Sequence, residues 1–284
     1  MIVFLNDQFL PKDEARISPD DRAFLFADGA YEVVRAYRGH LFRAREHWSR
    51  FHDSLRALRI PHPAGVDFSG IAAELLLRNQ LADAEATVYL QVSRGAAPRK
   101  HAFPTGDVAP TVYGFAAPFA NPTEKWARGV KVITLPDQRW ARCDIKSISL
   151  LPNVLANQLA QEAGAHEAVL IRDGFAMEGS LSNFAAVFDG VLHTAPRTNY
   201  ILPGISRLVA LGLCSALGIP VRESPVAQSE LKHAAEAMLF GTTNEVMPVV
   251  QIDERPVGDG QPGPLTRRLQ QAFRDYVEEC RQRG

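Results

Sequence analysis

Short runs in which apolar and polar residues alternate recur along the 284-residue chain, and they are rich in β-branched and aromatic residues. Both properties predict β-strands. The runs lie at residues 2–5, 8–10, 29–37, 41–42, 86–93, 111–119, 130–134, 167–171, 184–188, 191–194 and 237–240. Asn6 and Asp7 separate the first two runs and predict a hairpin turn.

Other segments place their apolar residues three or four positions apart, which predicts amphipathic helices. Trp48, Phe51 and Leu55 show this spacing within residues 46–58. Further helices are expected at residues 67–81, 147–163, 204–217, a short segment after Ser229, and 265–281. Ser147 is the expected N-cap of the helix that ends near residue 163.

The order of these elements indicates the fold class. Strands and helices do not alternate strictly, so the pattern favours an α+β fold over a doubly wound sheet. Asn121-Pro122-Thr123 interrupts the pattern, and a chain of this length is natural for two domains. We therefore expect a small N-terminal α+β domain at residues 1–120 and a larger C-terminal domain at residues 121–284, closely packed because the linker is short.

Composition narrows the class of protein. Apolar residues make up 46% of the chain and charged residues 22%, as is typical of a soluble globular protein. The formal net charge of −1 comes from interspersed charges, so neither nucleic acid nor a membrane surface is indicated as a partner. No run resembles a signal peptide or a membrane span. Cys143, Cys214 and Cys280 lack disulfide or metal-ligand spacing, so we expect a reducing cytoplasm and no metal site.

Three elements in the second half of the chain together indicate chemistry on pyridoxal 5'-phosphate. Lys146 lies between an apolar strand and a helix start with few charges, where partial desolvation favours a nucleophilic amine. Glu178 is able to keep a pyridine nitrogen protonated, and the helix start at Gly204-Ile205-Ser206-Arg207 offers N–H groups to a phosphate. Taken singly, these are equally a surface lysine, a solvated loop carboxylate and a plain helix start.

In order and spacing these elements resemble the class IV, fold-type IV pyridoxal phosphate-dependent aminotransferases. The matching signature is Glu178-x-Ser180-x-x-Asn183-Phe184, Leu192-x-Thr194 and Leu202-x-Gly204-Ile205-x-Arg207. The resemblance covers essentially the whole chain and includes Asp21-Arg22, Phe26-x-Asp28-Gly29-x-Tyr31-Glu32, Glu46-His47-x-x-Arg50, Lys146 and Phe240-Gly241-Thr242-Thr243. Two positions depart from the pattern. Ala185 replaces the usual aromatic residue, whose packing we expect Phe184 to take over, and Gly241 replaces a frequent serine.

The resemblance implies a role for each matching residue. Lys146 matches the lysine that forms a Schiff base with the cofactor, and Glu178 matches the partner of the pyridine nitrogen. The phosphate site is matched by Arg50, Ile205, Ser206 and Thr242. Because most of these residues follow residue 121, the C-terminal domain is the expected cofactor-binding domain.

Within the class, residues 92–104 resemble the D-amino acid aminotransferases. Arg99-x-His101 matches an arginine and a histidine that bind the substrate α-carboxylate together with a tyrosine matching Tyr31, and all three side chains are suitable donors. Without this resemblance, residues 99–101 would be read as a basic loop tip. Two further segments, Tyr31-Glu32-Val33-Val34 and Arg139-Trp140-x-Arg142-Cys143-Asp144-Ile145-Lys146, resemble the same subgroup.

The resemblance therefore implies ping-pong transamination between a D-amino acid of the D-alanine type and a 2-oxo acid of the 2-oxoglutarate or pyruvate type. It also implies a homodimer in which the loop carrying Arg99 and His101 reaches the neighbouring active site. An (R)-selective amine transaminase and a branched-chain L-amino acid aminotransferase are the alternatives within the class, since both keep Lys146 and Glu178. A non-catalytic cofactor-binding protein of the same fold is the alternative outside enzymes.

Overall fold

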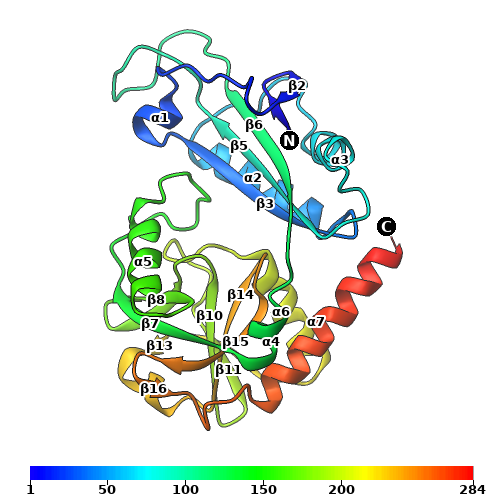
Figure 1. Ribbon diagram of the computed structural model, residues 1–284. Coiled ribbons are helices and arrows are strands. Elements are labelled where there is room, and N and C mark those ends of the chain that lie inside the picture. The colour runs from blue at the N-terminus through cyan, green and yellow to red at the C-terminus, as the bar shows by residue number, and fades with distance from the viewer. Residues whose placement is uncertain (284) are drawn as a thin grey trace. The chain divides into compact units, whose positions relative to one another are not determined.

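The computed structural model describes residues 1–283, which form two compact units (Figure 1). Unit 1 comprises Met1–Ala120 and Ile145–Ser149, and unit 2 comprises Asn121–Asp144 and Leu150–Gln282. Within residues 1–283, none of the helices combines the length and apolar character that a membrane crossing requires.

Unit 1 is built on a six-stranded antiparallel sheet in the order β2-β1-β6-β5-β3-β4. Its strands are β1 (Ile2–Leu5), β2 (Gln8–Pro11), β3 (Gly29–Tyr37), β4 (His40–Leu41), β5 (Ala86–Ser93) and β6 (Thr111–Pro118). The residues of β5 alternate in burial. Ala86 and every second residue after it are buried, whereas Thr87 and every second residue after it, up to Gln91, are partly exposed. The alternation seen in the sequence therefore gives the sheet one buried face.

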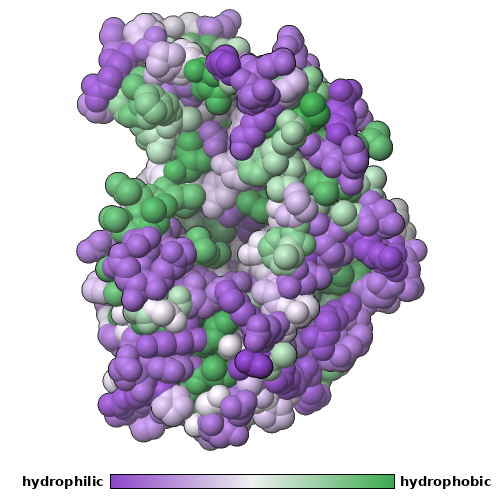
Figure 2. Space-filling model, in the orientation of Figure 1, coloured by the Kyte–Doolittle hydropathy of each residue, from purple (hydrophilic) through white to green (hydrophobic). Residues whose placement is uncertain are grey.

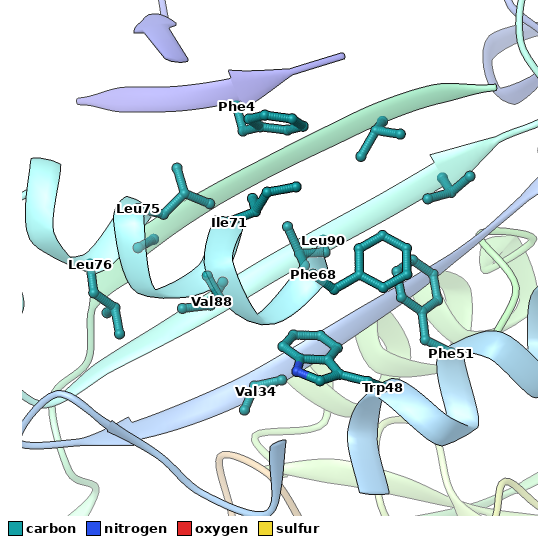
Figure 3. Close-up of a cluster of buried hydrophobic side chains, with 14 of the residues drawn as sticks. Phe4, Val34, Trp48, Phe51, Phe68, Ile71, Leu75, Leu76, Val88 and Leu90 are labelled. Atoms are coloured by element: carbon teal, nitrogen blue, oxygen red, sulfur yellow. The ribbon is translucent and has the colours of Figure 1, made fainter. Parts of the chain in front are cut away.

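The helices α2 (Ala44–Ala57) and α3 (Phe68–Arg78) pack on this sheet. Figure 3 shows Trp48 and Phe51 of α2 and Phe68 of α3 gathered with buried side chains of the strands. Burying an aliphatic or aromatic side chain of this size contributes about 1.5–3 kcal/mol. A short helix, α1 (Arg22–Phe26), precedes β3.

The segment Ile145–Ser149 lies along β3, although the sequence analysis placed it in the second domain. Ser147 forms an antiparallel bridge with Ala30, and the Tyr31 N–H donates to the Lys146 carbonyl at 3.0 Å. These bonds extend the sheet beside β3, so Lys146 belongs to unit 1.

Unit 2 contains a ten-stranded mixed sheet in the order β12-β11-β10-β14-β15-β7-β8-β9-β13, with β16 paired to β15. Its strands are β7 (Val130–Pro136), β8 (Glu167–Arg172), β9 (Phe175–Gly179), β10 (Asn183–Phe188), β11 (Val191–Thr194), β12 (Val221–Glu223), β13 (Val226–Ala227), β14 (Glu236–Gly241), β15 (Glu245–Ile252) and β16 (Arg255–Pro256). Glu178 of β9 also pairs with Asn183 of β10. This pairing closes β7, β8, β9, β10, β14 and β15 into a ring.

The helices of unit 2 are α4 (Thr123–Arg128), α5 (Leu151–Glu162), α6 (Ile205–Ala216), the 3₁₀ helix η1 (Gln228–His233) and α7 (Pro264–Arg283). Apolar side chains gather over α5 on the face drawn in Figure 2. The exposed ones are Leu151, Val154, Leu155 and Leu159.

Most predicted elements are confirmed within a few residues, but the helix expected from Ser147 is wrong at its start. Ser147 pairs with Ala30, and α5 begins only at Leu151, with Pro152 in its first turn. Seven elements were missed altogether: α1, α4, β9, β12, β13, β15 and β16. Pro248 lies within β15, and a proline argues against a strand when only the sequence is read.

Candidate active site

Lys146 and Tyr31 lie together in unit 1. The Lys146 amine is 4.2 Å from the centre of the Tyr31 ring. The Lys146 N–H donates to the Ser54 hydroxyl of α2 at 3.1 Å. Both Lys146 and Tyr31 are half-buried, so the predicted nucleophile is fixed through its backbone while its side chain keeps partial access to solvent.

Arg50 is oriented by a buried carboxylate on the strand that carries Tyr31. The Arg50 Nε and Nη2 donate to Glu32 at 2.7 and 2.9 Å, and His47 Nδ1 lies 2.8 Å from the same carboxylate. Burial alone would raise the pKa of Glu32, but Arg50 and His47 outweigh it and lower this pKa to about 2. Burial lowers the pKa of His47, and Glu32 opposes this effect.

Arg99 and His101 lie on the exposed loop between β5 and β6, beside one aromatic ring. The Arg99 guanidinium is 5.2 Å from the centre of the Phe26 ring of α1, and the His101 ring is 5.4 Å from it. The structure therefore brings these two predicted residues together. Within residues 1–283, no hydrogen bond or ring contact joins either of them to Tyr31.

Glu178 lies near the end of β9 in unit 2, where three donors hold its buried carboxylate. Arg139 donates to Oε1, the Asn183 amide donates to Oε2 at 2.8 Å, and the Leu202 N–H donates to Oε2 at 3.0 Å. Burial raises the pKa of Glu178 to about 7, and the charge of Arg139 opposes that rise. The carboxylate is therefore fixed in direction, and it titrates near neutrality.

Arg139 is itself held by Asp137, which accepts two hydrogen bonds from it at 2.9 Å. Burial alone would lower the pKa of Arg139, but Asp137 and Glu178 outweigh it, so this pKa is raised and the guanidinium stays charged. Arg172 donates to Asp137 from a further side at 3.1 Å. Glu178 thus stands at the end of a buried chain of alternating charges.

Asn183 joins Glu178 to the start of α6. Its amide donates to the Leu202 carbonyl at 3.0 Å, and its side-chain oxygen would lie 2.0 Å from a Cβ at Gly204. Gly204 is the N-cap of α6, and no side chain caps this helix start. Ile205 and Ser206 are its buried first residues. Free N–H groups at such a helix start favour an anion.

Two further signature residues, Thr194 and Arg207, have a structural role. Arg207 donates to the Thr194 hydroxyl at 3.3 Å and to the Ala195 carbonyl at 2.8 Å, and it pairs with Glu223 at 2.8 Å. The Thr194 hydroxyl donates to the Phe184 carbonyl at 2.8 Å. These bonds tie the first turn of α6 to strands β10 and β11.

A second buried carboxylate, Glu167, holds the loop after β9 close to the turn that carries Thr242. It accepts hydrogen bonds from the Leu181 N–H at 2.6 Å, the Ser182 hydroxyl at 2.9 Å and the Asn244 amide at 3.4 Å. All three donors are uncharged, and burial raises the pKa of Glu167 to about 7. Thr242 is half-buried in the turn between β14 and β15.

The two departures from the family pattern have different consequences. A Cβ at Gly241 would meet the Ser182 Cβ at 3.4 Å, an ordinary contact, so the turn has room for a serine. Ala185 is buried, and Phe184 beside it belongs to the main core of unit 2. Adjacent residues of a strand point to opposite faces, so Phe184 does not take over the packing at position 185 as we expected.

Sequence patterns predicted no role for three residues of the site, Arg139, Asp137 and Glu167. Arg139 lay within a segment that resembled the subgroup, and Glu167 opened an apolar run, but neither signal names a partner. Their roles depend on contacts with Glu178 and Ser182, which only the folded chain provides.

The fold and these two groups of residues correspond to a known class of enzyme. The family described as amino-transferase class IV matches residues 29–252, and the chain belongs to this family. The α+β, fold-type IV expectation is confirmed by similar solved structures. One is the branched-chain amino acid aminotransferase of Escherichia coli, with a TM-score of 0.88 and 27% identity over 96% of this chain and 93% of that one.

Individual relatives are more similar in sequence. The D-alanine aminotransferase of Staphylococcus aureus (strain COL) is 40% identical over 97% of this chain and 98% of its own length. The D-alanine aminotransferase of Bacillus licheniformis is 41% identical over 98% of this chain and 97% of its own length.

Proposed function

We propose that this chain catalyses transamination between a D-amino acid of the D-alanine type and a 2-oxo acid of the 2-oxoglutarate or pyruvate type. The observation that carries the proposal is an identity of 40% and 41% to two D-alanine aminotransferases over nearly the full length. Identity to the branched-chain enzyme of similar fold is 27%. The grouping of Arg99 and His101 beside Phe26 supports the same substrate class.

The cofactor in this proposal is pyridoxal 5'-phosphate, and residues of unit 2 fit it. Glu178 offers a buried carboxylate of fixed direction, as a pyridine nitrogen requires. The start of α6, without a side-chain cap, suits a phosphate. Within residues 1–283, the buried Ser180 hydroxyl makes no hydrogen bond. Buried hydroxyls normally have a partner, which a bound group would supply.

Each predicted residue then has a task. When bound, pyridoxal phosphate would supply an aldehyde for the amino group and a ring that withdraws electrons from the substrate α-carbon. Lys146 would anchor the cofactor, remove the α-proton as a base and deliver it as an acid to the aldehyde-derived carbon of the cofactor. Glu178 would keep a proton on the ring nitrogen. The phosphate would be bound by Arg50, Ile205, Ser206 and Thr242.

Substrate choice rests on the α-carboxylate. Arg99 and His101 supply charge-assisted donors, and the Tyr31 hydroxyl supplies a third. The side of the ring that receives the carboxylate decides between D- and L-amino acids, so these three residues set the stereochemistry. In this proposal the chain forms a homodimer, and the loop of Arg99 and His101 serves the neighbouring subunit, as two-fold symmetry allows for both sites.

The proposal also covers organisation and location. Residues 1–120 form the small N-terminal domain, and residues 121–284 form the larger cofactor-binding domain, except that Lys146 belongs to the segment beside β3 in unit 1. Cys143, Cys214 and Cys280 are free thiols, as in a cytoplasmic protein.

Absorbance of the bound cofactor tests the substrate class. D-alanine, L-leucine and (R)-phenylethylamine are added separately to the holoenzyme, and we expect D-alanine to convert the cofactor. Conversion by L-leucine alone would indicate a branched-chain aminotransferase, and conversion by the amine alone an amine transaminase. No conversion by any of the three would indicate a binding protein. Lys146→Ala should abolish turnover with D-alanine.

A further inference from the structure

The loop that carries Arg99 and His101 has little backbone support of its own. Within the described part of the chain, residues 98–110 make no backbone–backbone hydrogen bond. The base of the loop is tied by a bridge between Ala96 and Asp21. Figure 1 shows the loop between β5 and β6 arching beside α1. Side chains from elsewhere in unit 1 therefore set the conformation of its tip.

One buried guanidinium binds the tip of this loop. Arg22, the first residue of α1, is only 3% exposed. Its Nη1 donates to the Lys100 carbonyl at 2.6 Å and to the Ala102 carbonyl at 3.5 Å, and its Nη2 donates to the His101 carbonyl at 3.4 Å. Three consecutive carbonyls of the loop thus converge on one planar side chain.

Arg22 is held in turn by Asp28, the residue that precedes β3. The Arg22 Nε donates to Asp28 at 2.8 Å, and Arg94 donates to the same carboxylate at 2.8 and 3.0 Å. Burial would raise the pKa of Asp28, but hydrogen bonds from Arg94 and Arg22 outweigh it and lower this pKa. Arg94 also donates to the Leu58 and Arg59 carbonyls at 2.8 and 2.9 Å. The loop tip is therefore connected, through charged side chains, to the core of unit 1.

The Arg22 guanidinium also packs on the Phe26 ring, and the loop lies beside this ring. Arg22 is 4.7 Å from the centre of the Phe26 ring, which Arg99 and His101 also approach. The loop backbone is thus fixed by Arg22, and its two functional side chains rest on a ring that Arg22 also contacts.

We propose that Arg22 is a positioning residue for recognition of the substrate carboxylate, because it fixes the loop that carries Arg99 and His101. The inference rests on the proposed function, which makes these two residues the carboxylate-binding pair. It adds a specific requirement for arginine at position 22. A lysine ammonium is a single point charge, so it cannot span Asp28 and three loop carbonyls as a guanidinium does.

Steady-state kinetics of the holoenzyme with D-alanine and 2-oxoglutarate test the proposal. We expect Arg22→Ala and Arg22→Lys to raise KM for D-alanine about 10- to 100-fold and to change kcat less than about threefold. The absorbance spectrum of the bound cofactor should not change. Arg78→Ala on α3, which removes an exposed ion pair with Glu74, is the matched control and should leave KM unchanged.

A double-mutant cycle separates positioning from general destabilisation. In an Arg99→Ala background, Arg22→Ala should change KM less than about threefold, because both changes remove the same interaction. Additive effects, or a wild-type KM in Arg22→Ala and Arg22→Lys, would overturn the inference. If Arg22→Ala does not fold, Arg22→Lys carries the same test.

The outcomes also distinguish this inference from the proposed function. If Arg99→Ala raises KM for D-alanine and the Arg22 variants do not, only the inference fails. If the wild type does not convert D-alanine, or if Arg99→Ala leaves KM unchanged, the proposed function fails and the inference fails with it.

Discussion

Replacing Glu167 by glutamine should remove part of the pH dependence of stability. Burial raises the pKa of Glu167 from 4.5 to about 7. The unfolded chain lacks this effect, so the folded protein binds the proton more tightly. A group with a raised pKa contributes stability that is fully present below about pH 4.5 and is lost as the pH rises to about 7. Because one pKa unit corresponds to 1.36 kcal/mol, the loss at this site is about 3 kcal/mol.

Glutamine keeps the size of the side chain and an acceptor for the Leu181 N–H, but it carries no charge at any pH. The free energy of unfolding is measured in urea for the wild type and for Glu167→Gln. The wild-type value minus the value of the variant should fall by about 2–3 kcal/mol between pH 5 and pH 8. Glu178 also has a raised pKa, but it contributes equally to both proteins and cancels.

Glu254→Gln is the matched control, because its carboxylate is exposed at the surface of the same unit. Its difference from the wild type should stay constant over this pH range. A constant difference for Glu167→Gln as well would refute the argument that burial without a cationic partner sets the protonation of Glu167.

Three further predictions concern the cofactor site. Arg139→Met should move the acidic limb of the kcat–pH profile upward by about one pH unit, because the charge of Arg139 then no longer opposes the effect of burial on Glu178; an unmoved limb would contradict this. Gly204→Ala should weaken binding of pyridoxal phosphate to the apoenzyme at least about tenfold, because the new Cβ displaces Asn183. Gly241→Ser should tighten the same binding about two- to fivefold, since the turn has room for the hydroxyl; weaker binding would exclude a phosphate contact there.

Local patterns in the sequence accounted for much of the fold. The alternation in β5 and the helical spacing around Trp48 each predicted an element close to its observed bounds. These elements depend on residues that are near neighbours in the chain, so a short window contains the information. Where a long-range contact competes, as the bridge of Ser147 to Ala30 does with a helix start, the local pattern gave the wrong boundary.

The candidate site divides in the same way. Residue types and their spacing in the sequence predicted Lys146, Glu178 and the helix start at Gly204 as site residues, because each chemical task requires a particular residue type. The tertiary structure decided their partners. Arg139 meets Glu178 from 39 positions away, and Arg22 meets the Lys100 carbonyl from 78 positions away. Contacts across such separations depend on strand pairing and on the need to satisfy buried charges, and neither leaves a local pattern in the sequence.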